Sequence, residues 1–171
     1  MIFELIILLI FFCFSFAFLV LCIDTIVVAD SKTVYILEAK LGHQGKAAGE
    51  FSIPHSIAFD SLGNMYVTDN SNDRVQKFTS IGTFITKWGS HGTADGQIGL
   101  LLGIDVDSSG NVYTVDQANS RIQKFDSSGR FITGWTNPEF SKLEDIELDS
   151  SGNVYVTDRE KNEIFKFVQV R

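Results

Sequence analysis

Histidine, cysteine and acidic side chains are the groups in this chain that can hold a metal or move a proton. His55 lies in Ile-Pro-His-Ser-Ile just before a predicted strand, and Glu144 takes the equivalent place in a later repeat. Both cysteines, Cys13 and Cys22, lie in the apolar run of residues 5–23, so no thiolate ligand or thiol nucleophile exists after it. The sequence has no G-x-S-x-G motif, Gly-rich phosphate loop or Cys/His pair. It therefore shows no complete catalytic constellation.

One acidic stretch imitates a calcium-binding loop. Asp105, Asp107 and Asp116 take the first, third and twelfth places of an EF-hand-like spacing. The stretch recurs elsewhere with Ala58 or Glu147 at the first place, and strand-like alternation runs through it where an EF-hand needs flanking helices. We therefore expect a structural segment there and not a calcium site.

Asp69, Asp116 and Asp158 recur once per repeat, which favours a structural role over catalysis. We expect them to cap backbone N–H groups or to pair with the arginines that follow in two of the repeats. Six residues form the candidate binding surface: His55, Asn72, Arg74, Asn119, Arg121 and Glu144. Two of them are those arginines, two are the asparagines two positions before them, and His55 and Glu144 lie near the start of the first strand of a repeat. No catalytic residue or metal-ligand set is assigned.

These residues recur because three segments of the chain align without gaps. The segments are Ile57–Phe78, Ile104–Phe125 and Ile146–Phe167, whose starts are 47 and 42 residues apart. Such periods fit propeller blades of four short antiparallel strands, not the shorter leucine-rich or helical repeats. Asp-Ser-x-Gly-Asn predicts a hairpin turn in each segment, at Gly63, Gly110 and Gly152. Since no helical period follows residue 30, we predict an all-β fold.

The N-terminal part differs from the rest. Residues 5–23 are apolar except for Ser15 and, as a helix, would span about 28 Å, enough to cross a bilayer core. We predict a hydrophobic helix that is either a cleaved signal peptide or an uncleaved membrane anchor. Small or β-branched residues before Asp30 suit cleavage, whereas the length of the run and the lack of a preceding Lys or Arg argue against it. The expected parts are 1–29, signal peptide or anchor, and 30–171, with repeats at about 43–88, 89–135 and 136–168.

The charge balance bears on partners and location. The 171 residues include 14 Lys and Arg against 21 Asp and Glu, a formal net charge of −7. Without a basic block, no nucleic-acid partner is expected. Lys32 and Lys40 are the nearest cations after the apolar run, and the positive-inside rule would leave the C-terminal part in the cytoplasm. Two lysines weigh little, and we expect a membrane-anchored or secreted, extracytoplasmic protein.

The repeats resemble NHL repeats, and residues 33–168 are similar to part of an NHL-type β-propeller. The shared features are apolar-x-apolar-Asp-x-x-Gly-Asn-x-Tyr-Val-x-Asp, Asn-Asp-Arg or Asn-Ser-Arg before the third strand, and Gly-x-Phe-x-x-x-Trp in the fourth. The third repeat departs from the pattern, with Lys161 and Glu163 in place of Asn and Arg. In the amidating lyases, which share this fold, a Pro-His pair at the place of His55 supplies a zinc ligand. Leu102 and Glu144 hold the equivalent places here, so the resemblance implies an incomplete ligand set in one chain.

The repeats add up to three blades. Residues 34–42 take the place of a fourth, outer strand, and the last repeat stops after its third strand. Propellers have about four to eight blades. The chain is therefore expected to be either a fragment of a longer propeller or one half of a homodimer that completes a six-bladed ring.

Two classes of function are compatible with these repeats. The favoured one is a non-enzymatic scaffold that binds a protein, peptide or glycan, because the loops differ between repeats while the strands recur: residues 70–73, 117–120 and 159–162. No cofactor is expected for it. The alternative is a lyase- or lactonase-like enzyme with a metal in the propeller pore.

Overall fold

The computed structural model describes residues 26–28 and 34–170, in a chain that divides into units of residues 1–40 and 41–171. In the first unit, β1 (Ile26–Val28) pairs antiparallel with β2 (Val34–Ile36). This differs from the outer strand predicted over 34–42, because only Val34–Ile36 form a strand and their partner is β1. A strand-like sequence does not specify which edge the strand joins. The helix predicted at 5–23 lies outside the described residues, and no described helix is long and apolar enough to cross a membrane.

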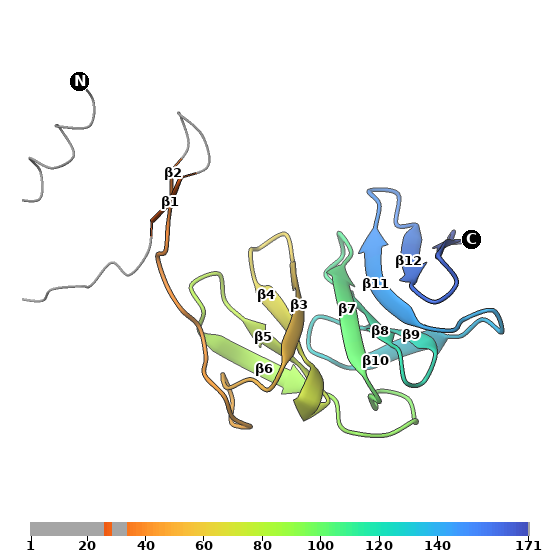
Figure 1. Ribbon diagram of the computed structural model, residues 1–171, viewed down its shortest axis with the longest axis horizontal. Helices are drawn as coiled ribbons and strands as arrows, with labels where there is room; N and C mark the ends of the chain where they lie inside the picture. The colour runs from red at the N-terminus through yellow and green to blue at the C-terminus, as the bar shows by residue number, and fades with distance from the viewer. Residues whose placement is uncertain (1–25, 29–33, 171) are drawn as a thin grey trace, which may run out of the picture. The chain divides into compact units, whose positions relative to one another are not determined.

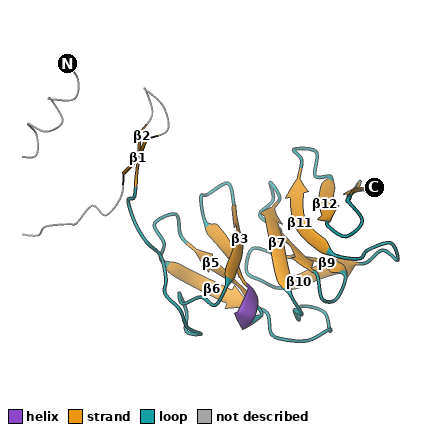
Figure 2. Ribbon diagram, viewed as in Figure 1, coloured by secondary structure: helices purple, strands orange, loops and turns teal. Residues whose placement is uncertain are grey.

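The second unit consists of three antiparallel sheets, which we call blades (Figures 1 and 2). The first contains β3 (Pro54–Phe59), β4 (Met65–Asp69), β5 (Arg74–Phe78) and β6 (Phe84–Trp88), with the short 3-10 turn η1 (Asn70–Asn72) after β4. The second contains β7 (Leu101–Val106), β8 (Val112–Asp116), β9 (Arg121–Phe125) and β10 (Phe131–Trp135). The third contains β11 (Leu143–Leu148), β12 (Val154–Asp158) and β13 (Glu163–Phe167). Strands follow one another in space as in sequence, which confirms the predicted all-β blades.

An aspartate holds the turn between the first two strands of each blade. Asp107 Oδ1 accepts the N–H groups of Ser109 and Asn111, both at 2.9 Å, and the Asn111 side chain donates to Oδ2 at 2.8 Å. Burial acts to raise the pKa of Asp107, but the bonds from Asn111 and the nearby Lys124 charge outweigh it, so the pKa lies below its ordinary value. The predicted glycines adopt the left-handed conformation that a tight turn needs, with φ of 77°, 82° and 79°: Gly63, Gly110 and Gly152.

Each blade carries the same irregularity near the start of its first strand. The pairing register shifts between Pro54 and Ile57 and at the equivalent places in the other two blades, Leu101/Ile104 and Leu143/Ile146. In the first blade the Ser56 N–H donates to Thr68 Oγ1 at 2.8 Å, outside the ladder. In the third blade the Asp145 N–H donates to Thr157 Oγ1 at 3.0 Å. The shift is a β-bulge that frees a short stretch of the inner strand from pairing.

The apolar core lies between neighbouring blades. Two clusters of buried side chains fill the first and second interfaces. The ring centroid of Trp88 lies 6.2 Å from Tyr66 in its own blade and 6.0 Å from Phe125 in the next. Trp135 repeats this arrangement with Tyr113 and Phe167, at 6.4 and 5.8 Å. Both tryptophans therefore pack between blades.

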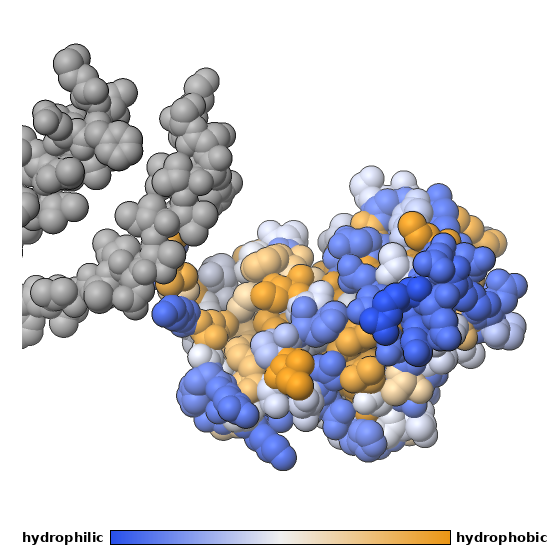
Figure 3. All heavy atoms as spheres, in the orientation of Figure 1, coloured by the Kyte–Doolittle hydropathy of each residue, from blue (hydrophilic) through white to orange (hydrophobic). Residues whose placement is uncertain are grey.

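The two outermost faces of the stack have no neighbouring blade among the described residues. Ile57 is 55% exposed, whereas its counterparts are buried against the preceding blade: Ile104 and Ile146. At the other end Ile164 is 69% exposed, whereas its counterparts are fully buried: Val75 and Ile122. In Figure 3 apolar surface is visible over the first blade. Both end faces therefore expose side chains of the kind that fill the interfaces.

Candidate functional site: polar clasps and inner-strand carboxylates

In the first blade, a buried aspartate gathers the polar residues singled out in the sequence. Asp69, at the end of β4, accepts hydrogen bonds from Asn72 Nδ2 at 2.9 Å and from Arg74 Nε at 2.7 Å. Its other oxygen accepts the Ser52 N–H at 2.6 Å. Both Asp69 and Arg74 are buried, so the ion pair is closed to water. The predicted structural role of this aspartate is confirmed.

The remaining bonds of Arg74 hold the loop before β3. Nη1 donates to the carbonyl of Lys46 at 2.6 Å, and Nη2 donates to those of Ala47 and Glu50 at 2.9 and 2.8 Å. Gln76 also donates to the Glu50 carbonyl, at 2.7 Å. A guanidinium has five N–H groups, and most of those on Arg74 are committed inside the chain. We call this arrangement a clasp: an aspartate, an asparagine and an arginine bind one another, and they hold the loop that precedes the first strand of the blade.

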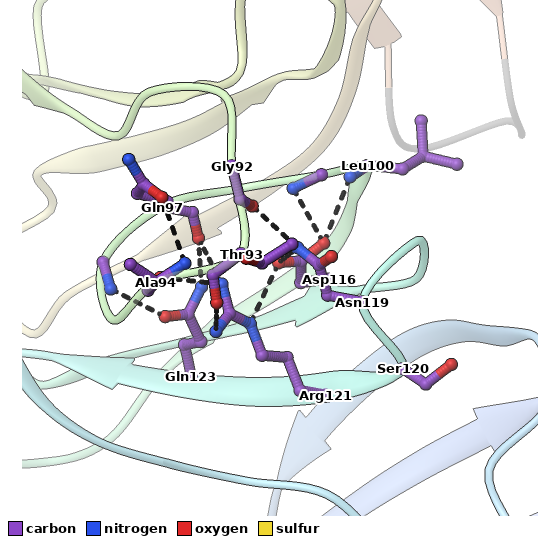
Figure 4. Close-up of polar contacts among 12 residues, drawn as sticks. Gly92, Thr93, Ala94, Gln97, Leu100, Asp116, Asn119, Ser120, Arg121 and Gln123 are labelled. Carbon is purple, nitrogen blue, oxygen red and sulfur yellow. Dashed lines mark hydrogen bonds and ion pairs between the residues drawn. The ribbon is translucent and has the colours of Figure 1, made fainter.

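The second blade repeats the clasp (Figure 4). Asp116 accepts Asn119 Nδ2 at 2.7 Å and Arg121 Nε at 3.1 Å, while its other oxygen accepts the N–H groups of Gly99 and Leu100. Arg121 also donates to three carbonyls of the loop before β7: Thr93, Ala94 and Gln97, at 2.7, 3.0 and 2.7 Å. In both blades the asparagine and the arginine therefore bind the aspartate of their own blade, and their contacts are within the chain: Asn72 and Arg74, Asn119 and Arg121. A role for them in ligand binding stays a prediction.

The third blade has the aspartate without the arginine. Asp158 accepts the N–H groups of Ser141 and Lys142 at 2.7 and 3.1 Å, and those of Glu160 and Lys161 at 3.2 Å each. Glu163 stands where the other blades have arginine and is exposed. The loop before β11 is anchored by Phe140, whose ring centroid lies 5.1 Å from that of Phe165. This end of the third blade consequently differs in charge and bonding from the other two.

Sequence reasoning missed the loop carbonyls and the two glutamines that complete the clasps, Gln76 and Gln123. Backbone acceptors have no residue identity, so no side-chain pattern shows them. One signal was present: residues 43–51 and 90–98 align at the same spacing as the first two repeats, with Gly45 matching Gly92 and Gly49 matching Gly96. A recurring loop next to a recurring arginine indicates that the two interact.

His55 and Glu144 lie at equivalent places on inner strands of different blades. His55 is exposed on β3, beside the bulge. Glu144 is half-buried on β11, and its Oε2 lies 3.7 Å from Arg159 Nη1. No contact between His55 and Glu144 is found, and the described part of the chain contains no group of three His, Cys, Asp or Glu side chains placed to hold a metal ion.

A group of carboxylates that the sequence analysis did not single out as a site lies between β7 and β11. Asp105 Oδ1 accepts the Val106 N–H at 2.7 Å, and its Oδ2 accepts the Leu148 N–H of the next blade at 2.6 Å. Burial raises the pKa of Asp105 in spite of these bonds. Burial and then the charges of Asp105 and Asp145 also raise the pKa of Glu147. Asp105, Asp145 and Glu147 therefore lie close enough for their charges to repel one another.

Solved structures with similar geometry define the class of fold. A virginiamycin B lyase from Staphylococcus aureus matches 81% of this chain and 46% of its own chain, with a TM-score of 0.53 and 18% identity. A gluconolactonase from Xanthomonas campestris matches 65% of this chain and 36% of its own, with a TM-score of 0.51 and 18% identity. At such identity the likeness concerns the fold alone, which is that of a partial β-propeller.

The sequence comparisons name the family. The family model of the NHL repeat matches residues 51–78. The human NHL repeat-containing protein 3 is 38% identical over 48 residues, which are 28% of this chain and 14% of that protein. Residues 51–78 are thus an NHL repeat within a partial β-propeller, as the sequence predicted, and the chain spans less than half the length of each of these three proteins. A fold of this class supports a scaffold or binding role.

Proposed function

We propose that this chain is a non-enzymatic binding scaffold whose blade loops contact a protein, peptide or glycan. The observation that carries the proposal is that recurring and variable residues have different roles within each blade. Residues that recur from blade to blade are engaged in internal bonds, as in the clasps of Asp69 and Asp116. Residues that vary lie in the loops between the second and third strands. A rigid frame with variable loops is suited to recognition.

The variable loops lie at one end of the blades with the loops before the inner strands. Asn72 Nδ2 donates to the Gly45 carbonyl at 2.9 Å, and Asn119 Nδ2 donates to that of Gly92 at 2.9 Å, which places each pair of loops side by side. The loop at 117–120 has no charged side chain, whereas the loop at 159–162 contains Arg, Glu and Lys. This end therefore offers a different chemistry over each blade.

A loop exchange tests the scaffold. In the full chain, residues 159–162 are replaced by the Gln-Ala-Asn-Ser of residues 117–120, and both proteins are screened against peptide and glycan arrays. We expect the exchange to remove binding of the ligands that the parent selects while leaving the melting temperature nearly unchanged. The reverse exchange is the matched control; it gives positions 117, 118 and 120 the residues found at 159, 160 and 162 and keeps the clasp residue Asn119. If the parent and both exchanged proteins have the same ligands, the loops are not the recognition surface.

We further propose that residues 5–23 place the blades at a membrane or outside the cytoplasm. The support is the apolar character of this run, in which Ser15 is the one polar residue. Expression of the full chain in a prokaryotic host followed by fractionation tests it. Recovery with the membrane or in the extracytoplasmic space is expected, and a mature form beginning at Asp30 would select cleavage over anchoring. A cytosolic full-length product would contradict the proposal.

The exposed end faces favour a second copy of the chain as a partner. One face presents Ile57 and Phe59, and the other presents Ile164. The counterparts of these faces meet twice inside the chain, so two copies can repeat the same interface and complete six blades. Light scattering of the full chain in detergent should give a monodisperse dimer. A stable monomer would refute the ring.

An enzyme of lyase or lactonase type is the second candidate. The inner strands carry ionisable groups in the region where such a site would lie, namely His55, Glu144 and the carboxylates of Asp105, Asp145 and Glu147. Elemental analysis of the purified chain distinguishes the candidates. Stoichiometric zinc or calcium that is lost in His55→Ala would favour the enzyme, and its absence would favour the scaffold.

A further inference from the structure

Besides Ile53 and Ile85, the first blade exposes two groups of large apolar side chains. Ile57 and Phe59 lie on its open face, and their counterparts are wholly or partly buried at an interface with the preceding blade: Ile104, Val106, Ile146 and Leu148. A neighbouring blade would therefore cover this first group. Leu62 and Ile81, which are 81% and 88% exposed, form the second group.

Leu62 and Ile81 stand at the tips of two turns in which the second blade has serine. Ser109 is the counterpart of Leu62, and Ser128 is the counterpart of Ile81. Both serines are exposed even though the second blade has a neighbour on that side. A blade packed against the first one would consequently leave Leu62 and Ile81 in water. Any occupant that covers them would therefore be of a different kind.

The two tips lie side by side. The Cβ of Ser80 lies 3.4 Å from the point where a Cβ on Gly63 would stand, which joins the turn of Leu62 to that of Ile81. Leu41 Cδ1 lies 3.4 Å from the corresponding point on Gly82, and Leu41 is itself exposed. Three aliphatic side chains therefore gather at one end of the blade, and we call them the tip patch: Leu41, Leu62 and Ile81.

The turns that carry the tip patch expose no charged side chain. Residues 61–64 and 79–83 read Ser-Leu-Gly-Asn and Thr-Ser-Ile-Gly-Thr. Asp60, at the base of the first turn, is nearly buried and bonded to Asn64. The matching turn of the second blade instead has the exposed ion pair of Asp126 and Arg130, at 3.2 Å. Burial of the two turn tips of the first blade would therefore not desolvate a charged group.

We propose that the tip patch inserts into the interfacial region of a lipid bilayer and orients the blades on the membrane. The inference rests on the proposed placement of the chain at a membrane by residues 5–23. Only residues 24–40 separate that apolar run from Leu41 along the chain. Aliphatic side chains on uncharged turn tips are suited to the boundary between headgroups and acyl chains, where an apolar surface gains by leaving water.

Depth-dependent quenching tests the proposal on the full chain. Cys13 and Cys22 are replaced by serine, and a single fluorophore is attached through Ser80→Cys. The matched control carries the fluorophore through Ser127→Cys, at the equivalent place of the second blade. Both proteins are reconstituted in phosphatidylcholine vesicles that contain nitroxide-labelled lipid, and flotation of the vesicles measures the bound fraction.

Quenching is expected at position 80 and not at position 127. Burial of one Leu or Ile side chain changes an equilibrium constant about tenfold or more. The pair L62S/I81S, which installs the serines of the second blade, should therefore lower the inserted population about a hundredfold and bring quenching at position 80 to the level at 127. A chain that floats with equal quenching at both positions overturns this inference and leaves anchoring intact. A chain that does not float overturns both proposals.

Discussion

Replacing Asp116 by alanine should destabilise the second blade more than any substitution on its surface. The carboxylate accepts four hydrogen bonds, from two backbone N–H groups, Asn119 and Arg121. The side chain of Asp116 is fully buried and that of Arg121 is only 14% exposed. Removing one partner of a buried ion pair costs about 3–5 kcal/mol, because the other charge is left without compensation. The carbonyls that still contact Arg121 offset part of this cost, so we expect a loss of about 4 kcal/mol in the free energy of unfolding.

The third blade supplies the matched control. Asp158 also accepts four N–H bonds and is also buried, but no arginine faces it. Asp158→Ala therefore leaves unpaired donors without an unpaired charge, and three of them lie on exposed residues that water can reach: Lys142, Glu160 and Lys161. Its cost should be about 2 kcal/mol. The difference between the two variants isolates the contribution of the ion pair.

Urea unfolding of the full chain, followed by the fluorescence of Trp88 and Trp135, measures both losses. A double-mutant cycle that adds Arg121→Met should give a coupling energy of about 2 kcal/mol with Asp116→Ala. If Asp116→Ala costs no more than Asp158→Ala, the clasp does not stabilise the blade through its charges. A coupling energy near zero would lead to the same conclusion.

Further predictions concern turns and pH. Gly110→Ala and Gly129→Ala both place a side chain at positive φ, but only at Gly129 would the new Cβ meet the Trp88 ring. Urea unfolding should therefore show a loss in the free energy of unfolding of about 1 kcal/mol for Gly110→Ala and of about 2 kcal/mol or more for Gly129→Ala. Hydrogen bonds from Ser128 and Asn153 lower the pKa values of Asp126 and Asp149 to about 2 from 3.8. Because the folded pKa lies below the unfolded one, this stabilisation is present above about pH 4 and is lost as the pH falls toward 2, which a series of melting temperatures would show as a decline. Burial, with the neighbouring carboxylates, raises the pKa of Glu147, so Glu147→Gln should raise the melting temperature at neutral pH and not below about pH 4.

The blades and their turns could be predicted from the sequence because their determinants are local. Asp107 and Gly110 lie within one turn, and the alternation around them fixes which side of the strand faces the core. The partner of Asp116 was also predictable, because an arginine follows the aspartate at the same sequence spacing in the first two repeats. Arg74 follows Asp69 as Arg121 follows Asp116. In each case a pattern of side chains specified the contact.

The rest could not be predicted because it depends on backbone groups or on chain geometry. The carbonyls that receive Arg74 have no residue type, and the contact between Asp105 and the Leu148 N–H links strands of different blades. The strand at Val34–Ile36 shows the same limit, since its composition indicates a strand but not its partner β1. Exposure at Leu62 and Ile81 was equally hidden, because a turn sequence shows an aliphatic residue without showing what covers it.

At the recurrent bulge, one residue differs between the blades while the pairing of the strands stays the same. Within the bulge the three blades carry histidine, leucine and glutamate at one place, His55, Leu102 and Glu144, and the flanking ladder is the same in all three. A residue that no ladder bond constrains can change without a cost in strand pairing. Each duplication of the repeat therefore supplies one freely variable position on the inner strand. Gain or loss of an ionisable group there is the smallest evolutionary step by which a blade of this design can acquire or abandon chemistry.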